Sequence, residues 1–366
     1  MLSDVRYGVR MLLKHPGFSA VAILVLALGI GANSAIFSLI NAMLLKPLPI
    51  HRPGELAGVY VERTTPPGGY RPFSYPNYLE LRARATAFSS LAAHEVTLVG
   101  VGDGDTTRRV FADVVTANYF QTYGVPLALG RAFTPEEEAP GANLPVAIVS
   151  HDHWVQQGRR PDIVGDSIVV NATPLTIVGV AAEGFTGSSV LVGPEVWLPL
   201  GLYGSVARDI VGAPNRSLTA RDTYALMVVG RLQPGRSLES VGPELEAISA
   251  ALATAYPATN DERVYRAATL PRLSVSTNPT TDGQFATLSA LLLGMSGVVL
   301  LIACLNLANM LLARGASRRR EMAIRLSLGG GRMRVVRQLL AEGLVLSLAG
   351  GAVGLVFAVW SAGALV

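Results

Sequence analysis

The chain has 366 residues and a formal net charge of +4; half of its residues are hydrophobic and only 15% are charged. Its mean hydropathy of +0.40 is high for a soluble protein of this length, which indicates a membrane protein. The only lysines, Lys14 and Lys46, each follow a leucine, which excludes the Gly-Lys-Ser/Thr core of an ATP-binding P-loop. The single cysteine, Cys304, excludes an intrachain disulfide, and its place in an apolar run predicts a small buried residue.

Residues 1–16 are predicted to form an amphipathic helix that lies in the membrane interface. Arg6, Arg10 and Lys14 recur every four residues, and valines and leucines occupy the opposite arc. Bases spaced in this way face anionic head groups while the apolar arc enters the bilayer. A merely solvated stretch beside the membrane is the alternative interpretation.

Three segments have about the 20 apolar residues that a helix needs to cross the hydrocarbon core. They are residues 17–45, 285–312 and 339–366. A cleaved signal peptide is the competing interpretation of the first segment, because a basic region precedes it. We favour a transmembrane helix, since the run is long for a signal peptide and contains no clear small-x-small cleavage site. The sequence therefore predicts a multi-pass α-helical membrane protein.

An excess of basic over acidic residues flanks these segments on one side only. The N-terminal stretch and residues 313–338, with Glu342, carry 11 bases and 3 acids, whereas Lys46 to Gln284 carry 19 bases and 23 acids. The positive-inside rule then places the N-terminus and residues 313–338 in the cytoplasm, and residues 46–284 outside it. The pI of about 9.3 reflects this topology and gives little support to nucleic-acid binding.

Residues 46–284 have the pattern of an α+β domain with two similar halves. Each half is expected to contain a strand, a helix and a strand, and the two halves can close into one ferredoxin-like layer. Residues of about 116–220 then form a strand-rich insertion. The predicted strands and helices of the halves are Leu56–Glu62, Tyr75–Ala83, Ser90–Val99, Arg108–Val115, Tyr224–Leu232, Leu238–Tyr256 and Val264–Leu270.

Chemically reactive patterns are scarce in this domain. Alternation in a strand would put His151 and His153 on one face, where a metal could meet them, but no third ligand is evident nearby. Glu136, Glu137 and Glu138 follow Thr134-Pro135 and predict the start of an exposed helical turn. The sequence contains no known hydrolase, zinc-protease or dinucleotide-binding motif, so we predict no catalytic, metal or cofactor-binding residues.

The apolar segments contain asparagines and glycines in place of charged groups. Asn33, Asn306 and Asn309 are expected to form hydrogen bonds between helices. Small residues such as Gly31 and Ala35, or Gly350 and Gly354, would let two helices approach closely.

The ordered motifs resemble the FtsX-like ABC transporter permeases of the MacB type. The segment NLANMLLARGASRRREMAIRLSLGGGRMRVVRQLLAEGLVLSLAGGAVGL resembles the permease domain, which would begin at about residue 285. VVTANYFQTYGVPLALGRAF and VAIVSHDHWVQQGRRPDIVGDSIVVNATPLTIVGVA resemble the MacB-type periplasmic core domain. The first span and its flanks look especially like the duplicated MacB-like permeases of Acidobacteria. The resemblance implies a porter-type ferredoxin-like unit in the periplasm.

The resemblance also implies partners and a mechanism. A separate ABC ATPase would hydrolyse ATP, and a second permease half or a second copy would pair with this chain in the inner membrane, with a periplasmic or outer-membrane partner as a further expectation. No cofactor and no nucleic acid is implied. Family members have four spans, so a chain with three is expected to be a piece of a longer protein. Their described roles are efflux and mechanotransmission.

The loop at residues 313–338 is expected to couple the permease to the ATPase. Glu321 and Arg325 form a favourable i, i+4 pair on a short helix, which three glycines end. Apolar residues on this helix need cover, and the resemblance implies that an ATPase supplies it. The predicted coupling residues are Glu321, Met322, Ile324, Arg325, Leu326 and Leu328.

Two other classes of function stay open from the sequence. The first is an ATPase-independent membrane receptor or scaffold, whose outer domain binds a ligand or an envelope protein. The second is a secreted enzyme, which would require cleavage of the first span.

Overall fold

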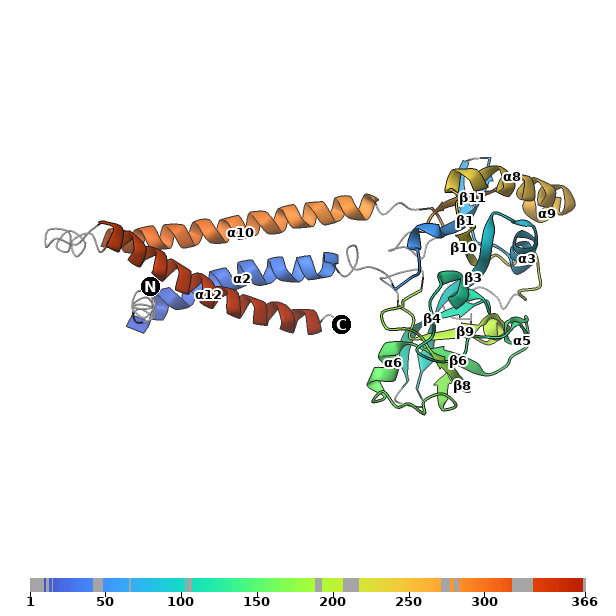
Figure 1. Ribbon diagram of the computed structural model, residues 1–366, viewed down its shortest axis with the longest axis horizontal. Helices are drawn as coiled ribbons and strands as arrows, with labels where there is room; N and C mark the ends of the chain where they lie inside the picture. The colour runs from blue at the N-terminus through green and yellow to red at the C-terminus, as the bar shows by residue number, and fades with distance from the viewer. Residues whose placement is uncertain are drawn as a thin grey trace. The chain divides into compact units, whose positions relative to one another are not determined.

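The computed structural model divides the chain into two compact units, each of which is described by itself (Figure 1). The helical unit comprises Met1–Lys46 and Gly283–Val366, and the sheet unit comprises Pro47–Asp282. The structure describes residues 10, 13–14, 16–41, 49–65, 67–102, 104, 107–187, 193–206, 217–270, 277–279, 283–317 and 332–364.

Three long helices make up the described part of the helical unit: α2 (Pro16–Ile40), α10 (Gly283–Ser317) and α12 (Arg332–Ala364). Two of them contain segments long and apolar enough to cross a membrane, Pro16–Ser38 and Ser289–Ala313. The corresponding apolar part of α12 is shorter within the described residues, Gly343–Val359. The prediction that Cys304 is buried is wrong, because its side chain is exposed on the outside of α10.

The three helices meet at a small apolar core. Ala22 and Leu26 of α2 pack with Leu307 of α10 and Leu346 of α12, and Leu346 is completely buried. Most other large apolar side chains of α10 and α12 are exposed, as expected of helices surrounded by lipid.

The sheet unit begins and ends with the predicted ferredoxin-like half. Its strands lie in the order β11-β1-β10-β3, and all neighbouring pairs are antiparallel. This is the order that two strand-helix-strand halves adopt when they close into one layer, so the predicted α+β fold class is confirmed. The elements are β1 (Leu56–Thr64), α3 (Tyr75–Arg84), β3 (Phe88–Val101), β10 (Met227–Leu232), α8 (Leu238–Ala255) and β11 (Arg263–Thr269).

Strands β4 to β9 extend the same sheet beyond β3 and form what we call the added half. β4 pairs antiparallel with β3 along its whole length and parallel with β9, so it belongs to both halves. The sheet continues in the order β4-β9-β6-β8-β5. The elements are β4 (Arg108–Val115), α4 (Tyr119–Tyr123), β5 (Leu129–Gly130), α5 (Pro135–Glu138), β6 (Val146–Val149), α6 (His151–Gln156), β7 (Ser167–Val170), β8 (Thr173–Val180), β9 (Val196–Pro199) and α7 (Tyr203–Val206).

Short elements complete the sheet unit. The strand β2 (Pro67–Arg71) pairs with the end of β1, and β7 pairs with both β3 and β8. The helix α9 (Pro257–Asn260) follows α8, a turn of 3-10 helix (Pro53–Glu55) precedes β1, and another (Leu200–Leu202) precedes α7.

Alternating residues of the strands divide into two cores on opposite faces of the sheet. On β6, Ala147 and Val149 join the core beneath α3 and α8, whereas Ile148 joins the other core. The second core is rich in aromatic rings, with Phe185 stacked on the fully buried Trp197 at a centroid distance of 5.7 Å. Because strand side chains alternate between faces, a single sheet holds both cores together.

The helix α8 covers the first core with one regular stripe. Its buried residues Val241, Leu245, Ile248 and Leu252 recur at spacings of four, three and four. This is the 3.6-residue period of an amphipathic helix, and the polar Ser249 is buried beside this stripe.

Candidate functional site

The helices α2 and α10 are joined by reciprocal hydrogen bonds between two polar residues. Asn33 donates from Nδ2 to the carbonyl oxygen of Ser296 at 3.0 Å, and the Ser296 hydroxyl donates to Asn33 Oδ1. Ser296 is buried, and Asn33 also donates to the carbonyl of Gly29 in its own helix at 2.9 Å. The predicted role of Asn33 is confirmed. Asn306 and Asn309 are exposed, and neither side chain forms a hydrogen bond within the described residues.

The helices α2 and α12 make contact through backbone atoms. A Cβ atom built at Gly354 would lie 3.0 Å from the carbonyl oxygen of Ala27, and one at Gly31 would lie 3.1 Å from the carbonyl oxygen of Gly354. At Gly350 it would lie only 2.6 Å from Cβ of Leu26. Gly350 and Gly354 form a GxxxG pair, and the predicted close packing of these glycines is confirmed.

The chain enters and leaves the sheet unit through two neighbouring strands. The first strand after α2 is β1, and the last strand before α10 is β11. These two strands are paired antiparallel from Ala57↔Thr269 to Arg63↔Arg263. The beginning of β1 and the end of β11 therefore lie side by side, so a displacement of one strand is passed to the other through the ladder of hydrogen bonds.

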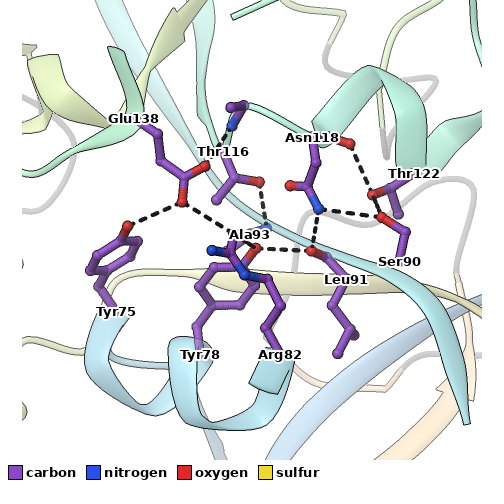
Figure 2. A network of polar contacts seen from close by, with 11 residues as sticks. Tyr75, Tyr78, Arg82, Ser90, Leu91, Ala93, Thr116, Asn118, Thr122 and Glu138 are labelled. Carbon is purple, nitrogen blue, oxygen red and sulfur yellow. Dashed lines mark hydrogen bonds and ion pairs between the residues drawn. The ribbon is translucent and has the colours of Figure 1, made fainter. Parts of the chain in front are cut away.

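Glu138 joins the added half to the ferredoxin-like half. Its carboxylate accepts hydrogen bonds from the Tyr75 hydroxyl at 3.0 Å and from the Ala117 backbone N–H at 2.9 Å, and it pairs with Arg82 at 3.4 Å (Figure 2). Tyr75 and Arg82 come from α3, whereas Glu138 ends α5. Burial and the nearby Glu138 raise the pKa of Tyr75, so its hydroxyl stays a donor. We call these four residues the Glu138 cluster.

The same region continues as a chain of polar contacts along β3, which Figure 2 shows to the right of Glu138. Thr116 exchanges hydrogen bonds with Ala93, and the Asn118 side chain donates to the carbonyl oxygen of Leu91 at 2.7 Å. Tyr78 of α3 donates to the same carbonyl at 2.9 Å. The connection from β4 to α4 is thereby fixed to β3 of the ferredoxin-like half.

Arg231 makes a second joint on the opposite side of β3. Its guanidinium donates to the carbonyl oxygens of Thr122 and Tyr123, both at 2.9 Å, and pairs with Glu55 at 3.2 Å. Thr122 and Tyr123 end α4, whose last carbonyls would otherwise lack partners. One side chain of β10 thus caps a helix of the added half.

Buried ionisable groups lie on both faces of the β3–β4 pair. His94 contacts Asp113 at 2.9 Å, and the Tyr119 hydroxyl donates to the same carboxylate at 2.8 Å. Glu95 points to the other face, where Oε2 is buried without a hydrogen-bond partner. Burial and the nearby Asp113 raise the pKa of Glu95 from 4.5 to about 7, against the opposing effect of a hydrogen bond from Tyr203.

The acidic triplet differs from its prediction. Thr134 caps α5 through a capping box with Glu137, as a Thr-x-x-Glu pattern allows. The expected exposure of the whole turn is wrong, because Glu137 and Glu138 are both 5% exposed and only Glu136 faces solvent. Arg131 pairs with Glu137 at 2.7 Å and offsets its buried charge.

The histidine pair also differs from its prediction. His151 and His153 lie on the helix α6 instead of a strand, because the Ser150 side chain accepts from the His153 N–H and caps the helix. Two residues apart on a helix, the two rings do not share a face. His153 contacts Glu195 at 2.7 Å, and His151 packs edge-on against Trp154. Within the described residues no group of three metal-ligating side chains occurs.

Most of the predicted coupling and interfacial residues lie outside the described part of the chain. This is the case for Arg6 and for Glu321, Met322, Ile324, Arg325, Leu326 and Leu328. Arg10 and Lys14 are described, and both are helical and exposed.

Two family models match successive parts of the chain. The MacB-like periplasmic core domain matches residues 19–248, which is more than half of the chain. The chain belongs to this family. The FtsX-like permease C-terminal domain matches residues 293–366, which include most of α10 and all of α12. The protein is therefore a MacB/FtsX-like membrane protein with a large MacB-type periplasmic domain.

Individual relatives are distant. The macrolide export ATP-binding/permease protein MacB 1 of Yersinia pestis bv. Antiqua (strain Antiqua) is 26% identical over 243 residues, 66% of this chain and 33% of the relative. MacB of Escherichia coli (strain K12) is 24% identical over 246 residues, 67% of this chain and 34% of the relative. The periplasmic region of MacB from Actinobacillus actinomycetemcomitans superposes with a TM-score of 0.42 at 8% identity, over 60% of this chain and 90% of that one. The chain spans about a third of the length of the curated relatives.

Proposed function

We propose that the protein is the permease subunit of an ABC transporter, in which a separate ATPase drives the helices and the helices move the periplasmic domain. The observation that carries this proposal is the entry and exit of the chain through paired strands. Because β1 and β11 form one ladder, α2 and α10 act on neighbouring points of a single sheet. Force applied to the two helices is then delivered to one place.

The bonding between helices supports a mechanical role. Asn33 and Ser296 make α2 and α10 move together, since breaking reciprocal polar contacts in lipid is costly. At Gly31 and Gly354 the contact between α2 and α12 is made by backbone atoms and by apolar side chains, Ile30 and Phe357, without side-chain hydrogen bonds at these glycines. Such a surface holds the helices close and leaves few specific bonds to break when α12 moves.

The sheet unit is suited to transmit the movement without deforming. The Glu138 cluster and Arg231 attach the added half to the ferredoxin-like half on two sides of strand β3. A displacement that enters at β1 and β11 is passed to the added half, where a periplasmic or outer-membrane partner would respond.

The membrane topology belongs to this proposal. We place the protein in the cytoplasmic membrane as a multi-pass protein, with a cytoplasmic N-terminus and residues 46–284 in the periplasm. The asymmetry of basic residues described above supports this orientation. Arg6, Arg10 and Lys14 would hold the interfacial helix against anionic lipids.

The ATPase would dock on residues 313–338. Met322, Ile324, Leu326 and Leu328 would fill a groove of the ATPase, with Glu321 and Arg325 paired beside them. A second permease half or a second copy of the chain would complete the transporter. The named relatives are macrolide exporters that carry their own ATP-binding part. Efflux or mechanotransmission is the corresponding role here.

The test measures the turnover of the partner ATPase. The intact protein in lipid nanodiscs is mixed with candidate ABC ATPases from the same organism, and copurification and ATP hydrolysis are followed. Met322→Asp or Leu326→Asp should abolish docking, because a charge would enter an apolar groove. Ser327→Asp, in the same loop but outside the apolar set, is the control and should dock normally.

Two outcomes decide between transport and an ATPase-independent receptor. Copurification that Leu326→Asp abolishes and Ser327→Asp preserves supports the permease. If no ATPase binds the intact protein, or if Leu326→Asp leaves binding and turnover unchanged, the proposed coupling is wrong.

A further inference from the structure

The added half contains a cavity that the proposed transport role does not use. It lies between α6, the loop that follows it, the hairpin of β7 and β8, and the end of β3, and its volume is about 310 Å³. This is at the small end of the range for ligand sites, about 300 to 1,000 Å³. A single ring with a short substituent is the appropriate size.

The cavity has an apolar floor. Val101, Ile163, Ile168 and Ile177 line it, and each of these side chains is at most 6% exposed. In the described parts of the chain the lining contains no phenylalanine, tyrosine or tryptophan. The polar residues of the lining, Gln157, Arg160, Asp166 and Ser167, are more exposed than this floor. The buried part of a ligand therefore meets aliphatic surface, where an apolar body fits better than hydroxyl groups without partners.

One buried polar side chain faces this floor in a fixed orientation. His153 borders the cavity, its side chain is only 9% exposed, and its Nδ1 lies 2.7 Å from Oε1 of Glu195. Burial alone would raise the pKa of Glu195, but hydrogen bonds from His153 and Arg108 hold it below its ordinary value. Glu195 is therefore an ionised acceptor, and Nδ1 of His153 carries the proton.

The second nitrogen of this ring is left for a ligand. Among the described residues no hydrogen bond reaches Nε2 of His153. When the ring carries a proton on Nδ1 alone, Nε2 has a free lone pair and accepts a hydrogen bond. A ligand that lies in the cavity meets one oriented acceptor beside an aliphatic floor.

Arg160 and Asp166, the charged side chains of opposite sign that line the cavity, pair with each other. Arg160 pairs at 3.0 Å with both Asp162 and Asp166, and the Trp154 indole fixes its carbonyl oxygen at 2.7 Å. A charged ligand would lose its hydration without gaining an unpaired opposite charge. The cavity consequently favours a neutral molecule.

We propose that this cavity binds a neutral, ring-sized molecule with one hydrogen-bond donor, of the phenol class, which donates to Nε2 of His153 while its ring packs on Ile163, Ile168 and Ile177. The phenol comes either from a free small molecule or from a tyrosine side chain of another protein. The site is independent of ATPase coupling, so each proposal can fail without the other.

The test compares two ligands of nearly equal shape. The intact protein in nanodiscs, with ¹³C-labelled isoleucine δ1 methyl groups, is titrated with p-cresol and with 4-methylanisole, which lacks the donor. We expect both to shift the methyl signals of Ile163, Ile168 and Ile177. p-Cresol should bind up to about tenfold more tightly, because the net contribution of one hydrogen bond is about 0.5–1.5 kcal/mol. Empty nanodiscs measure partitioning into lipid.

Two variants test the role of His153. His153→Ala should remove the preference for p-cresol, whereas His151→Ala, on the same helix but outside the cavity, should keep it. Ser167→Trp at the exposed rim should fill the cavity and abolish binding of both ligands. A preference that survives His153→Ala, or methyl shifts that survive Ser167→Trp, would overturn the proposal.

Two further titrations distinguish a free phenol from a tyrosine side chain of another protein. N-acetyltyrosinamide and a tyrosine-containing peptide present the same group on a backbone, and the matching phenylalanine peptide is their control. Tighter binding of p-cresol supports a small-molecule site, and tighter binding of the tyrosine peptide supports a protein partner. If neither phenol binds more tightly than its donor-free control, the assignment is wrong.

Discussion

The hydroxyl of Tyr75 donates to the carboxylate of Glu138 at 3.0 Å and so joins a helix of the ferredoxin-like half to a helix of the added half. Glu138 is 5% exposed, which makes its three donors necessary. A buried carboxylate is stable only when hydrogen bonds and opposite charge replace its hydration. The joint is therefore strong while complete and weak when one member is removed.

Glu138→Gln should destabilise the periplasmic domain by about 1–3 kcal/mol. The amide removes the charge that Arg82 pairs with and turns an N–H₂ group toward the donor of Ala117 or of Tyr75. Urea unfolding followed by the fluorescence of the buried Trp197 measures the change. Glu136→Gln, two positions away and exposed, should change stability by no more than about 0.5 kcal/mol. If the two variants changed the free energy of unfolding equally, the hydrogen bonds of Glu138 would not be what stabilises the contact between the two halves.

The sequence was sufficient to predict the ferredoxin-like half but not its joints. Strand β4 has the predicted bounds, Arg108–Val115, because period-2 alternation is a local signal. The Thr134–Glu137 capping box is also local. The burial of Glu138 is not, because its partner Tyr75 lies 63 residues earlier in the chain. Only the folded sheet brings these residues together.

The error at the histidines has a different cause. Two histidines separated by one residue satisfy the period of a strand, and a six-residue helix is too short to show a period of its own. Ser150 was the available signal, since serine is a preferred residue before the first turn of a helix. The Arg231 joint carried no comparable signal, because its acceptors are backbone carbonyls of a distant helix.

Because of Glu95, the free energy of unfolding should fall as the pH rises. Its pKa is raised from 4.5 to about 7 in the folded protein, so between these values the unfolded chain releases a proton that the folded chain retains. Unfolding is favoured progressively across this window, by about 3 kcal/mol in total, and the effect levels off above pH 7. Glu95→Gln should remove the dependence and be the more stable protein at pH 8.

Urea unfolding at pH 4.5, 6 and 8 measures this difference. The gap between Glu95→Gln and the unmodified protein should widen with pH, while Glu183→Gln, at an exposed acid, should follow the unmodified protein throughout. A gap that is constant from pH 4.5 to 8 would show that Glu95 does not titrate in this window.

Asn33→Leu should loosen the contact between α2 and α10. The substitution removes the hydrogen bonds with Ser296 and leaves the Ser296 hydroxyl without its acceptor, at a cost of about 1 kcal/mol. Spin labels on the two helices should report a broader distance distribution in nanodiscs. Asn309→Leu changes an exposed asparagine of α10 and should leave the distribution as it was. If the distance distribution is unchanged in Asn33→Leu, the hydrogen bonds between Asn33 and Ser296 are not what holds α2 and α10 together.

Gly354→Leu should separate α12 from α2. A side chain at this position would bring Cβ to 3.0 Å from the Ala27 carbonyl oxygen and 3.2 Å from Cβ of Ile30, closer than a rigid backbone tolerates. Gly351→Leu is the matched control, since a Cβ there meets its nearest atom, on Ile30, at an ordinary 3.9 Å. Spin-label distances between α2 and α12 should increase only for Gly354→Leu, and ATPase stimulation should fall with them, because the helix after the coupling loop would no longer move α2. If both leucine variants keep the helices together, the close glycine contact is not what holds α12, and the pathway of movement must run through α10 alone.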